Sequence, residues 1–401
     1  MRLREFFEKF SMDDISTELK ILAAAFFIYY LAWGVINPFI SIYIHRITGI
    51  YSGTGFLIGF MFLLQLSVMM PLGDLVDKIG SKIITVFSFF NYMGVGLVYF
   101  FANSFVGILV ARAWNTFSSS GVWISGVTLA REFSKNDKEA ESMAFFNFAW
   151  TVSSVIGPLL GILILLLFPL RTVFLLLPIC AVVAAAIVHG FVPEAIEKRE
   201  RIGKGIKDVI FKDRVFAKEF KDLFSKKENI MVAFIHFIRR FNFGVMTMVL
   251  ALFARELGGE LWQVAIIYSI FYIPFMTRIE FGAFADDFGR RKMIGIGTLL
   301  SSLVLFNLFM VNSLPIVFVL TLILAIGTSM IAPSVEGIIT RIGRGWEGEA
   351  TGIYQSVGSL AMGTGPIIAG IISDIYSLNH AFLLSGLMFL TVFPVLWKLK
   401  L

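Results

Sequence analysis

Twelve long apolar runs, separated by short polar segments, constrain this chain more than any other feature. Each run is about 20 residues or longer, the length that a helix needs to cross the hydrocarbon core of a bilayer. Barrel strands would be about 10 residues of alternating polarity. Backbone groups find no water in that core, so helices that pair their own N–H and C=O groups are favoured. The sequence predicts membrane-spanning helices at 21–44, 54–72, 83–101, 104–130, 141–168, 170–192, 229–255, 261–281, 292–312, 315–340, 350–374 and 379–399.

The composition agrees with a membrane protein. Apolar residues make up 57% of the chain and charged residues 15%, whereas soluble domains are nearer one half and one quarter. The single cysteine, Cys180, lies in the sixth run, so no intramolecular disulfide can form. We expect a buried thiol there, with no metal site and no cofactor.

The basic residues predict the orientation. Of the 34 Lys and Arg residues, 27 fall in the termini and in alternate connecting segments, and only Arg46, Arg171 and Arg255 fall in the opposite set. Cytoplasmic segments carry this excess. The sequence therefore predicts cytoplasmic termini and a multi-pass protein of the plasma membrane. The net charge of +6 is explained by this bias, so no nucleic-acid partner is expected.

The chain also contains an internal repeat. "GDLVDKIGSK", which begins at Gly73, recurs as "GAFADDFGRRK", which begins at Gly282. Gly34 and Pro158 have counterparts at nearly the same spacing, Gly244 and Pro366. We predict an all-α membrane fold of two parallel six-helix repeats. The halves are 1–192 and 229–401, joined by a cytoplasmic linker, 193–228, that is either a charged tether or an amphipathic helix.

The repeated segment combines three kinds of residue with separate physical roles. Gly73 and Gly282 have no side chain and would let helices approach closely, while Gly80 and Gly289 suit a positive-φ turn. Asp77 and Asp286 can accept hydrogen bonds from a helix N-terminus and pair with arginine. We interpret the segment as a latch that closes the cytoplasmic side; the alternative is a solvated turn.

Twelve helices, a long central loop and the repeated segment resemble the major facilitator superfamily. The first copy matches that family's signature loop, with Ser81 in place of a basic residue, at Gly73, Asp77, Lys78, Gly80 and Lys82. The second copy, with Asp287 in place of a basic residue, matches at Gly282, Asp286, Gly289, Arg290 and Arg291. The resemblance implies a transporter that works by alternating access.

Two further segments resemble motifs of the same family. "IGPLLG" resembles a motif of its antiporter branches, and the residues that could bend or closely pack the fifth and eleventh helices are Gly157, Pro158, Gly161, Gly365, Pro366 and Gly370. Arg112 resembles a motif linked to proton coupling, but Asn115 and Thr116 stand where its glycine would be. Arg112 is therefore either a coupling residue or half of a structural ion pair.

Polar residues inside the runs are the candidates for a substrate cavity. On a helical wheel, His236, Arg239, Arg240, Phe243 and Thr247 fall on one face of the seventh helix. We expect Arg240, with Arg239 or His236, to contact an anionic part of the cargo; the alternative is pairing with Glu336 or Glu280. His236 or Glu336 could carry a coupling proton. In the first half, the expected polar or aromatic wall consists of Tyr30, Trp33, Asn37, Gln65 and Asn115.

These features predict a secondary transporter for a small organic solute, with protons as the coupling ion and the protein as a monomer. Efflux of amphipathic compounds is slightly favoured, because Phe and Met make an adaptable cavity. The alternatives are proton-coupled transport of an organic anion or sugar-like metabolite, or a receptor that transports nothing. An enzyme is not expected, since the four His are far apart in the sequence and no ATP-binding loop occurs.

Overall fold

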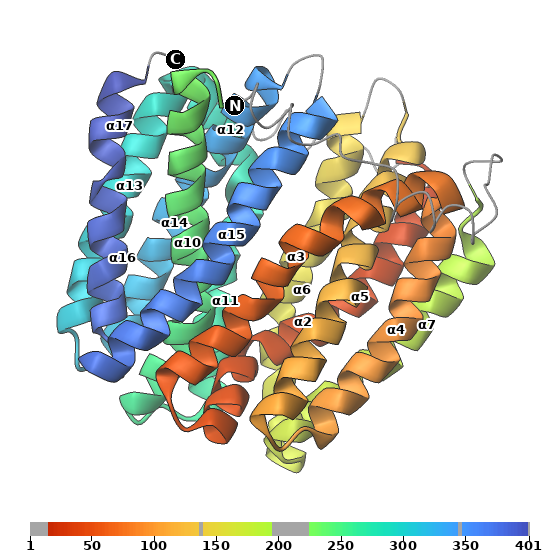
Figure 1. Cartoon of the computed structure of the whole chain (residues 1–401), viewed down its shortest axis with the longest axis horizontal. Coiled ribbons are helices and arrows are strands. Elements are labelled where there is room, and N and C mark those ends of the chain that lie inside the picture. Colours follow the sequence, from red (N-terminus) through yellow and green to blue (C-terminus); the bar gives the residue numbers. More distant parts are fainter. Residues whose placement is uncertain (1–14, 136–138, 195–223, 344–346, 400–401) are drawn as a thin grey trace. The chain divides into compact units, whose positions relative to one another are not determined.

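The computed structural model describes residues 15–135, 139–194, 224–343 and 347–399, and it is helical over nearly all of the twelve predicted spans. No strand occurs within these ranges. The first six spans are α2 (Thr17–Thr48), α3 (Tyr51–Ile79), α4 (Ser81–Phe101), α5 (Phe105–Glu132), α6 (Glu139–Leu167) and, after a 3-10 turn η2 (Leu170–Leu175), α7 (Leu176–Phe191) (Figure 1). The predicted all-α membrane fold is thus confirmed.

Two of the last six spans are interrupted. They are α10 (Lys227–Glu256), α11 (Leu261–Tyr272) with η3 (Ile273–Thr277) and α12 (Arg278–Phe288), α13 (Arg290–Met310), α14 (Leu314–Ile342), α15 (Glu347–Ile375), and α16 (His380–Leu390) with α17 (Val392–Lys398). The sequence analysis expected one uninterrupted helix over 261–281. Pro274 lies at the start of η3 and has no N–H to donate, so the α-helical pattern gives way to a 3-10 turn there.

Eleven of these spans, among the residues that the structure describes, are long and apolar enough to cross a membrane. The twelfth is α5, which is less apolar because Arg112, Asn115 and a run of three serines lie within it. Arg112 and Asn115 are both buried. Their polarity is therefore directed into the protein and not toward lipid, as expected for polar groups at membrane depth.

The chain divides into two compact units. The first unit is Met1–Ile36 with Ser67–Asp213, and the second is Asn37–Leu66 with Arg214–Leu401. The end of α2 and the start of α3 therefore pack with the helices of the second unit. The predicted linker, 193–228, falls mostly on residues outside the described ranges, and so does its expected amphipathic helix.

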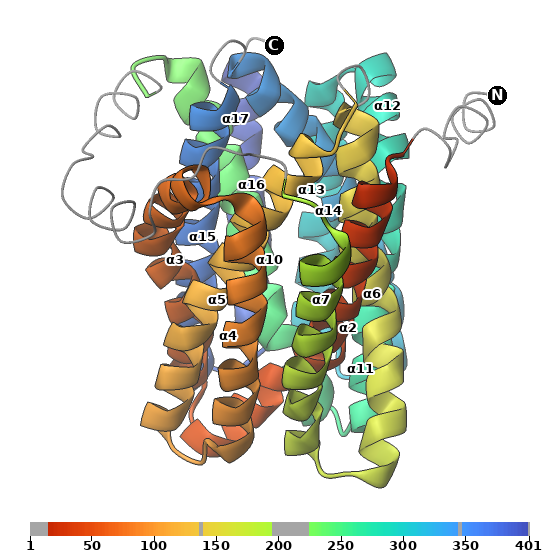
Figure 2. The same cartoon turned by 90° about the vertical axis from the view of Figure 1, so that its right-hand side faces the viewer.

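Within the first unit, α4 packs between α5 and α7 (Figure 2). An aromatic cluster fills its interior: the ring centroids of Tyr29 and Tyr92 are 4.9 Å apart, and those of Tyr29 and Phe89 are 5.3 Å apart. Helices α2 and α6 touch through glycines, since a Cβ on Gly157 would lie 2.6 Å from the Cα of Gly34. Close packing of backbones replaces side-chain contact here.

Within the second unit, α10 is central and runs beside α15 (Figure 1). A Cβ on Gly244 would lie 2.8 Å from the carbonyl oxygen of Met362, and one on Gly365 would lie 2.5 Å from that of Phe241. Both glycines therefore permit close contact between the two helices. Because α15 is helical across Gly365 and Pro366, the packing interpretation of this pair has direct support in the geometry.

Candidate functional site

A group of charged side chains meets inside the second unit, where three helices contribute to it. Helix α10 carries His236, Arg239 and Arg240, and Arg278 is the first residue of α12, directly after the proline break. Helix α14 contributes Glu336. The break in the eighth span therefore determines where Arg278 lies.

Arg239 pairs with Glu336. The Nη2 of Arg239 lies 3.4 Å from the Oε1 of Glu336, and the arginine side chain is 10% exposed while the glutamate side chain is 52% exposed. The sequence analysis gave pairing with Glu336 or Glu280 as the alternative to a solute contact, and Arg239 does pair with Glu336. Glu280, the other candidate partner, forms no ion pair within the part of the chain that the structure describes.

The other two arginines have no carboxylate partner among the described residues. The guanidinium carbon of Arg278 lies 4.5 Å from the centre of the Phe275 ring, a cation–π contact. Arg240 lies over Gly358 of α15, where a Cβ would come within 3.0 Å of its Nε. Three guanidinium groups thus share one carboxylate. In a membrane interior, this excess of positive charge is costly and favours an anionic partner.

The residues predicted to share one face of α10 are divided between two surroundings. His236 and Arg240 both lie against Gly358 of α15. Arg239 instead reaches Glu336 of α14, and the ring of Phe243 packs near Tyr272 with centroids 6.4 Å apart. The wheel placed these side chains together because it contains no information about which helix packs on either flank.

The wall expected from the first half is also divided. Tyr30, Trp33 and Asn115 belong to the first unit, whereas Asn37 and Gln65 belong to the second. The Tyr30 hydroxyl is buried and has no hydrogen-bond partner within the described ranges. The rings of Trp33 and Tyr92 have centroids 6.0 Å apart, which places Trp33 at the edge of the aromatic cluster.

The repeated polar segment is mostly helical. Gly73, Asp77 and Lys78 lie in the last turns of α3, and Gly80 alone separates α3 from α4. Gly80 has a φ of 110° and Gly289 a φ of 94°, so the predicted positive-φ turns are confirmed. The expected close approach at the other glycines is wrong, since a Cβ on Gly73 would meet nothing within 4 Å and one on Gly282 only an ordinary contact at 3.7 Å.

Alanine at these turns should destabilise the protein. Gly80→Ala and Gly289→Ala would each force a Cβ-bearing residue into a region that L residues rarely adopt, at a cost of about 1–3 kcal/mol. Thermal unfolding of the purified variants measures the loss. Gly73→Ala is the matched control, because it adds a methyl group to open space. Equal melting temperatures for all three variants would contradict this account.

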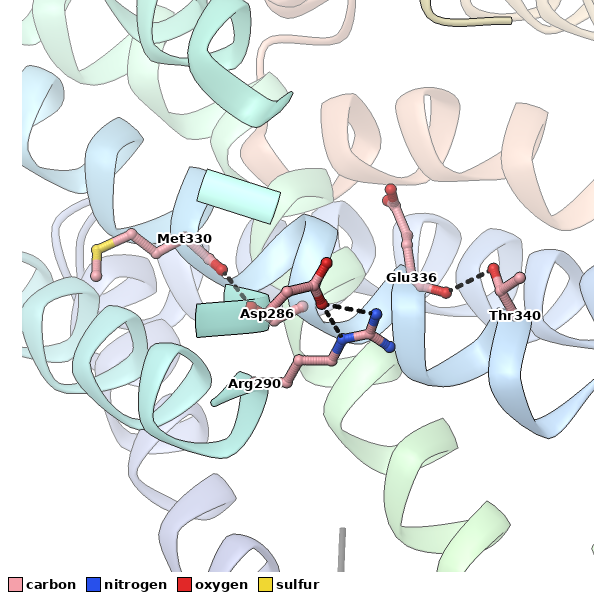
Figure 3. Close-up of polar contacts among 6 residues, drawn as sticks. Asp286, Arg290, Met330, Glu336 and Thr340 are labelled. Atoms are coloured by element: carbon pink, nitrogen blue, oxygen red, sulfur yellow. Dashed lines mark hydrogen bonds and ion pairs between the residues drawn. The ribbon is translucent and has the colours of Figure 1, made fainter. Parts of the chain in front are cut away.

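The two aspartates of the repeat differ in their ion pairing within the described residues. Asp286 accepts two hydrogen bonds from Arg290, at 2.9 and 3.1 Å, and the Arg290 guanidinium lies over Gly337 of α14. Figure 3 shows that Glu336, although adjacent to Gly337, points its carboxylate away from this pair. Asp77 is exposed and forms no ion pair within the described residues, which differs from the arginine pairing that we expected.

Ser81 stands where the signature loop usually has a basic residue. Its hydroxyl lies 2.8 and 3.0 Å from the two carboxylate oxygens of Glu132 on α5, a shared contact between the ends of α4 and α5. Burial raises the pKa of Glu132, and the hydrogen bond from Ser81 opposes that shift. At this turn the neutral hydroxyl of Ser81, in place of a basic side chain, is the hydrogen-bond partner of the Glu132 carboxylate.

At the opposite end of α3 lies a cluster that the sequence analysis missed. The backbone N–H groups of Tyr51 and Ser52, the first residues of α3, each donate to Asp374 of α15 at 2.8 Å. The Tyr51 hydroxyl bonds Glu256, the last residue of α10, and the His45 ring stacks on Tyr51. We call these residues the Asp374 cluster. A negative charge at a helix N-terminus is favourable.

The backbones of α3 and α15 touch beside this cluster. A Cβ on Gly55 would lie 2.1 Å from the carbonyl oxygen of Pro366, and one on Gly370 would lie 2.4 Å from that of Tyr51. The sequence offered one signal for this cluster, which was the aspartate Asp374 at the end of the eleventh apolar run. Nothing in the sequence, however, indicated that its partner would be the second helix.

Removing the charge of Asp374 should loosen the start of α3. Asp374→Asn weakens a capping interaction worth about 1 kcal/mol. A loss of this size makes the population in which the start of α3 is separated from α15 about fivefold larger. In a Cys180→Ala background, Ser52→Cys should react about fivefold faster with a membrane-impermeant maleimide. Glu260→Gln is the control, because the hydrogen bonds of Glu260 within the described residues are at the start of α11. Unchanged labelling in Asp374→Asn would refute the assignment.

Comparison with known proteins decides the family. The sequence profile of the Major Facilitator Superfamily matches residues 22–279 and, in a second match, residues 232–401. The chain belongs to the Major Facilitator Superfamily. The resemblance seen in the sequence is therefore confirmed, and the protein is a multi-pass membrane transporter of this superfamily.

Relatives and solved structures agree with that family. The transporter is 23% identical over 373 residues to an uncharacterized MFS-type transporter of Methanocaldococcus jannaschii, covering 90% of this chain and 92% of the relative. It is 21% identical to multidrug resistance protein 2 of Bacillus subtilis, covering 98% of each. Its fold matches an inward-facing, unoccupied bacterial homolog of the human lysosomal transporter Spinster, with a TM-score of 0.79, 14% identity and 97% coverage of each chain.

Proposed function

We propose that this superfamily member transports a small organic solute with an anionic group by alternating access, coupled to protons. The charge imbalance of the second unit carries the proposal: Arg239, Arg240 and Arg278 share the single carboxylate of Glu336 among the described residues. An anionic group on the solute would offset the cost of these cations. Arg240 and Arg278 are both partly buried and have no carboxylate partner in the described ranges, but Arg278 packs on the ring of Phe275, so we assign the solute contact to Arg240.

Glu336 is the proposed coupling residue. Its carboxylate is half exposed and lies 3.4 Å from Arg239, so protonation of Glu336 would release that guanidinium. His236 is the other candidate, but it lies with Arg240 against Gly358. A second positive charge beside Arg240 would be repelled, which favours Glu336 as the proton carrier. Arg112 remains a coupling candidate on sequence alone.

Efflux of amphipathic compounds is the second candidate. The aromatic cluster around Tyr29, Tyr30, Trp33 and Tyr92 in the first unit favours it, because aromatic walls adapt to varied apolar groups. Relatives named as multidrug resistance proteins agree with it. The two candidates differ in the charge of the solute, so transport of matched anions and cations separates them.

The remaining features of the proposal come from the sequence. They are a monomer in the plasma membrane, cytoplasmic termini, a cytoplasmic latch at Asp77 and Asp286, and bending or packing at Gly157 and Pro158. A receptor that transports nothing would retain solute binding and show no flux.

Transport in proteoliposomes tests the proposal. The full chain is reconstituted, and uptake of labelled carboxylates, neutral sugars and lipophilic cations is measured with and without an imposed pH gradient. We expect gradient-dependent flux of a carboxylate, and Glu336→Gln should retain solute exchange while losing the response to the gradient. Flux restricted to cations would favour the efflux candidate, and binding without any flux would favour a receptor.

A further inference from the structure

A small cavity lies inside the helix bundle of the second unit. About 20 Å³ is open to the centre of a water-sized molecule, close to what one such molecule needs. Six helices and the 3-10 turn η3 surround it, and the residues that matter here are Arg239, Asn242, Phe243, Phe275, Arg278 and Thr328. Two guanidinium groups therefore share an otherwise largely apolar space.

The two arginines that line this cavity have hydrogen-bond donors left over. Arg239 uses Nη2 for Glu336, and its Nε is buried without a hydrogen-bond partner within the part of the chain described. The Nε of Arg278 is likewise buried and unpartnered there, and the contact with Phe275 uses only the face of the guanidinium. Arg239 is 9% exposed, so bulk water does not satisfy it. Unmet donors on buried cations are costly.

We propose that this cavity binds a single chloride ion through the guanidinium groups of Arg239 and Arg278. Chloride accepts hydrogen bonds from N–H groups, and the cavity has the size of about one small molecule. Among the described residues, the three arginines exceed the single carboxylate of Glu336 by two positive charges, and a chloride ion would neutralise one of them. Water is the competing occupant: it would satisfy the unpartnered amide oxygen of Asn242, but it would leave the charge excess in place.

Halide-dependent stability tests the site without any transport. The purified full chain is unfolded thermally at constant ionic strength, with chloride or bromide replacing gluconate stepwise. Binding to the folded state alone should raise the melting temperature saturably, by about 2 to 4 °C. A melting temperature that is the same in chloride and gluconate refutes the site, and it leaves the proposed transport function untouched.

Two variants and one direct measurement locate the ion. Arg278→Gln should lose the halide response, whereas Arg171→Gln should keep it, because Arg171 makes a comparable ring contact with Phe100 in the first unit. Thr328→Met should also lose the response, by filling the cavity without changing charge. If Arg278→Gln fails to fold, anomalous scattering from bromide in crystals of the wild-type protein shows where the halide binds. A peak beside Arg239 and Arg278 supports the site, and a bromide peak elsewhere or none overturns it.

Discussion

Replacing Arg240 with alanine should reduce the affinity for an anionic solute by at least about 30-fold. Loss of one partner from a buried charge pair costs about 2–5 kcal/mol, and each 1.4 kcal/mol is tenfold in affinity. Arg240 is the best candidate for this loss because, in the described ranges, its guanidinium has neither a carboxylate partner nor a ring contact like that of Arg278 with Phe275. Counterflow of the labelled anion in proteoliposomes measures the effect, and the melting temperature reports whether the variant is folded.

Two variants keep this test specific. Arg240→Lys retains the charge and loses the planar fork, so it should recover part of the affinity. Arg255→Gln removes an arginine from the same helix, but Arg255 bonds the carbonyl oxygen of Gly259 at the end of α10, so affinity should not change. A folded Arg240→Ala protein with wild-type affinity would reject Arg240 as the solute contact. Equal losses in Arg240→Ala and Arg255→Gln would indicate a general effect of arginine removal.

The fold was predictable because its signals are long and repeated. A run of about 20 apolar residues can satisfy its backbone in a membrane only as a helix, whatever surrounds it. The positive φ at Gly80 and Gly289 was readable for a similar reason, since the sharp connection between two long helices must be made by a residue without a Cβ. The apolar runs and the turn glycines are local constraints, so they can be recognised in the sequence without knowing which helices are neighbours.

The site was only partly predictable, because it depends on which helices become neighbours. Glu336 could be named as an arginine partner from burial cost alone, and it does pair with Arg239. Arg278 acquires its place only through the break at Pro274, and Asp374 meets Tyr51 across more than 300 residues of sequence. A wheel for α10 shows directions around one axis, and it cannot show that α14 and α15 lie on different flanks.

Gly157→Ala should lower the stability of the folded protein by about 3 kcal/mol, the upper end of the usual cost of overpacking. The added Cβ would lie 2.5 Å from the carbonyl carbon of Gly34, where only backbone could move to relieve it. Gly34→Ala should have a similar effect from the other side, since its Cβ would lie 2.2 Å from the carbonyl oxygen of Ser153. Thermal unfolding measures both, with Gly190→Ala as the control because nothing lies within 4 Å of its Cβ position.

The same variant separates packing from bending at the glycine–proline motif of α6. If Gly157 serves packing, Gly157→Ala lowers the melting temperature, and the transport rate per folded molecule stays unchanged. If it serves as a hinge, the melting temperature stays near that of wild type while the rate falls, because the obstacle then arises only during the conformational change. The contact with Gly34 favours the first outcome: a glycine pressed against a neighbouring backbone has little space to bend without breaking that contact.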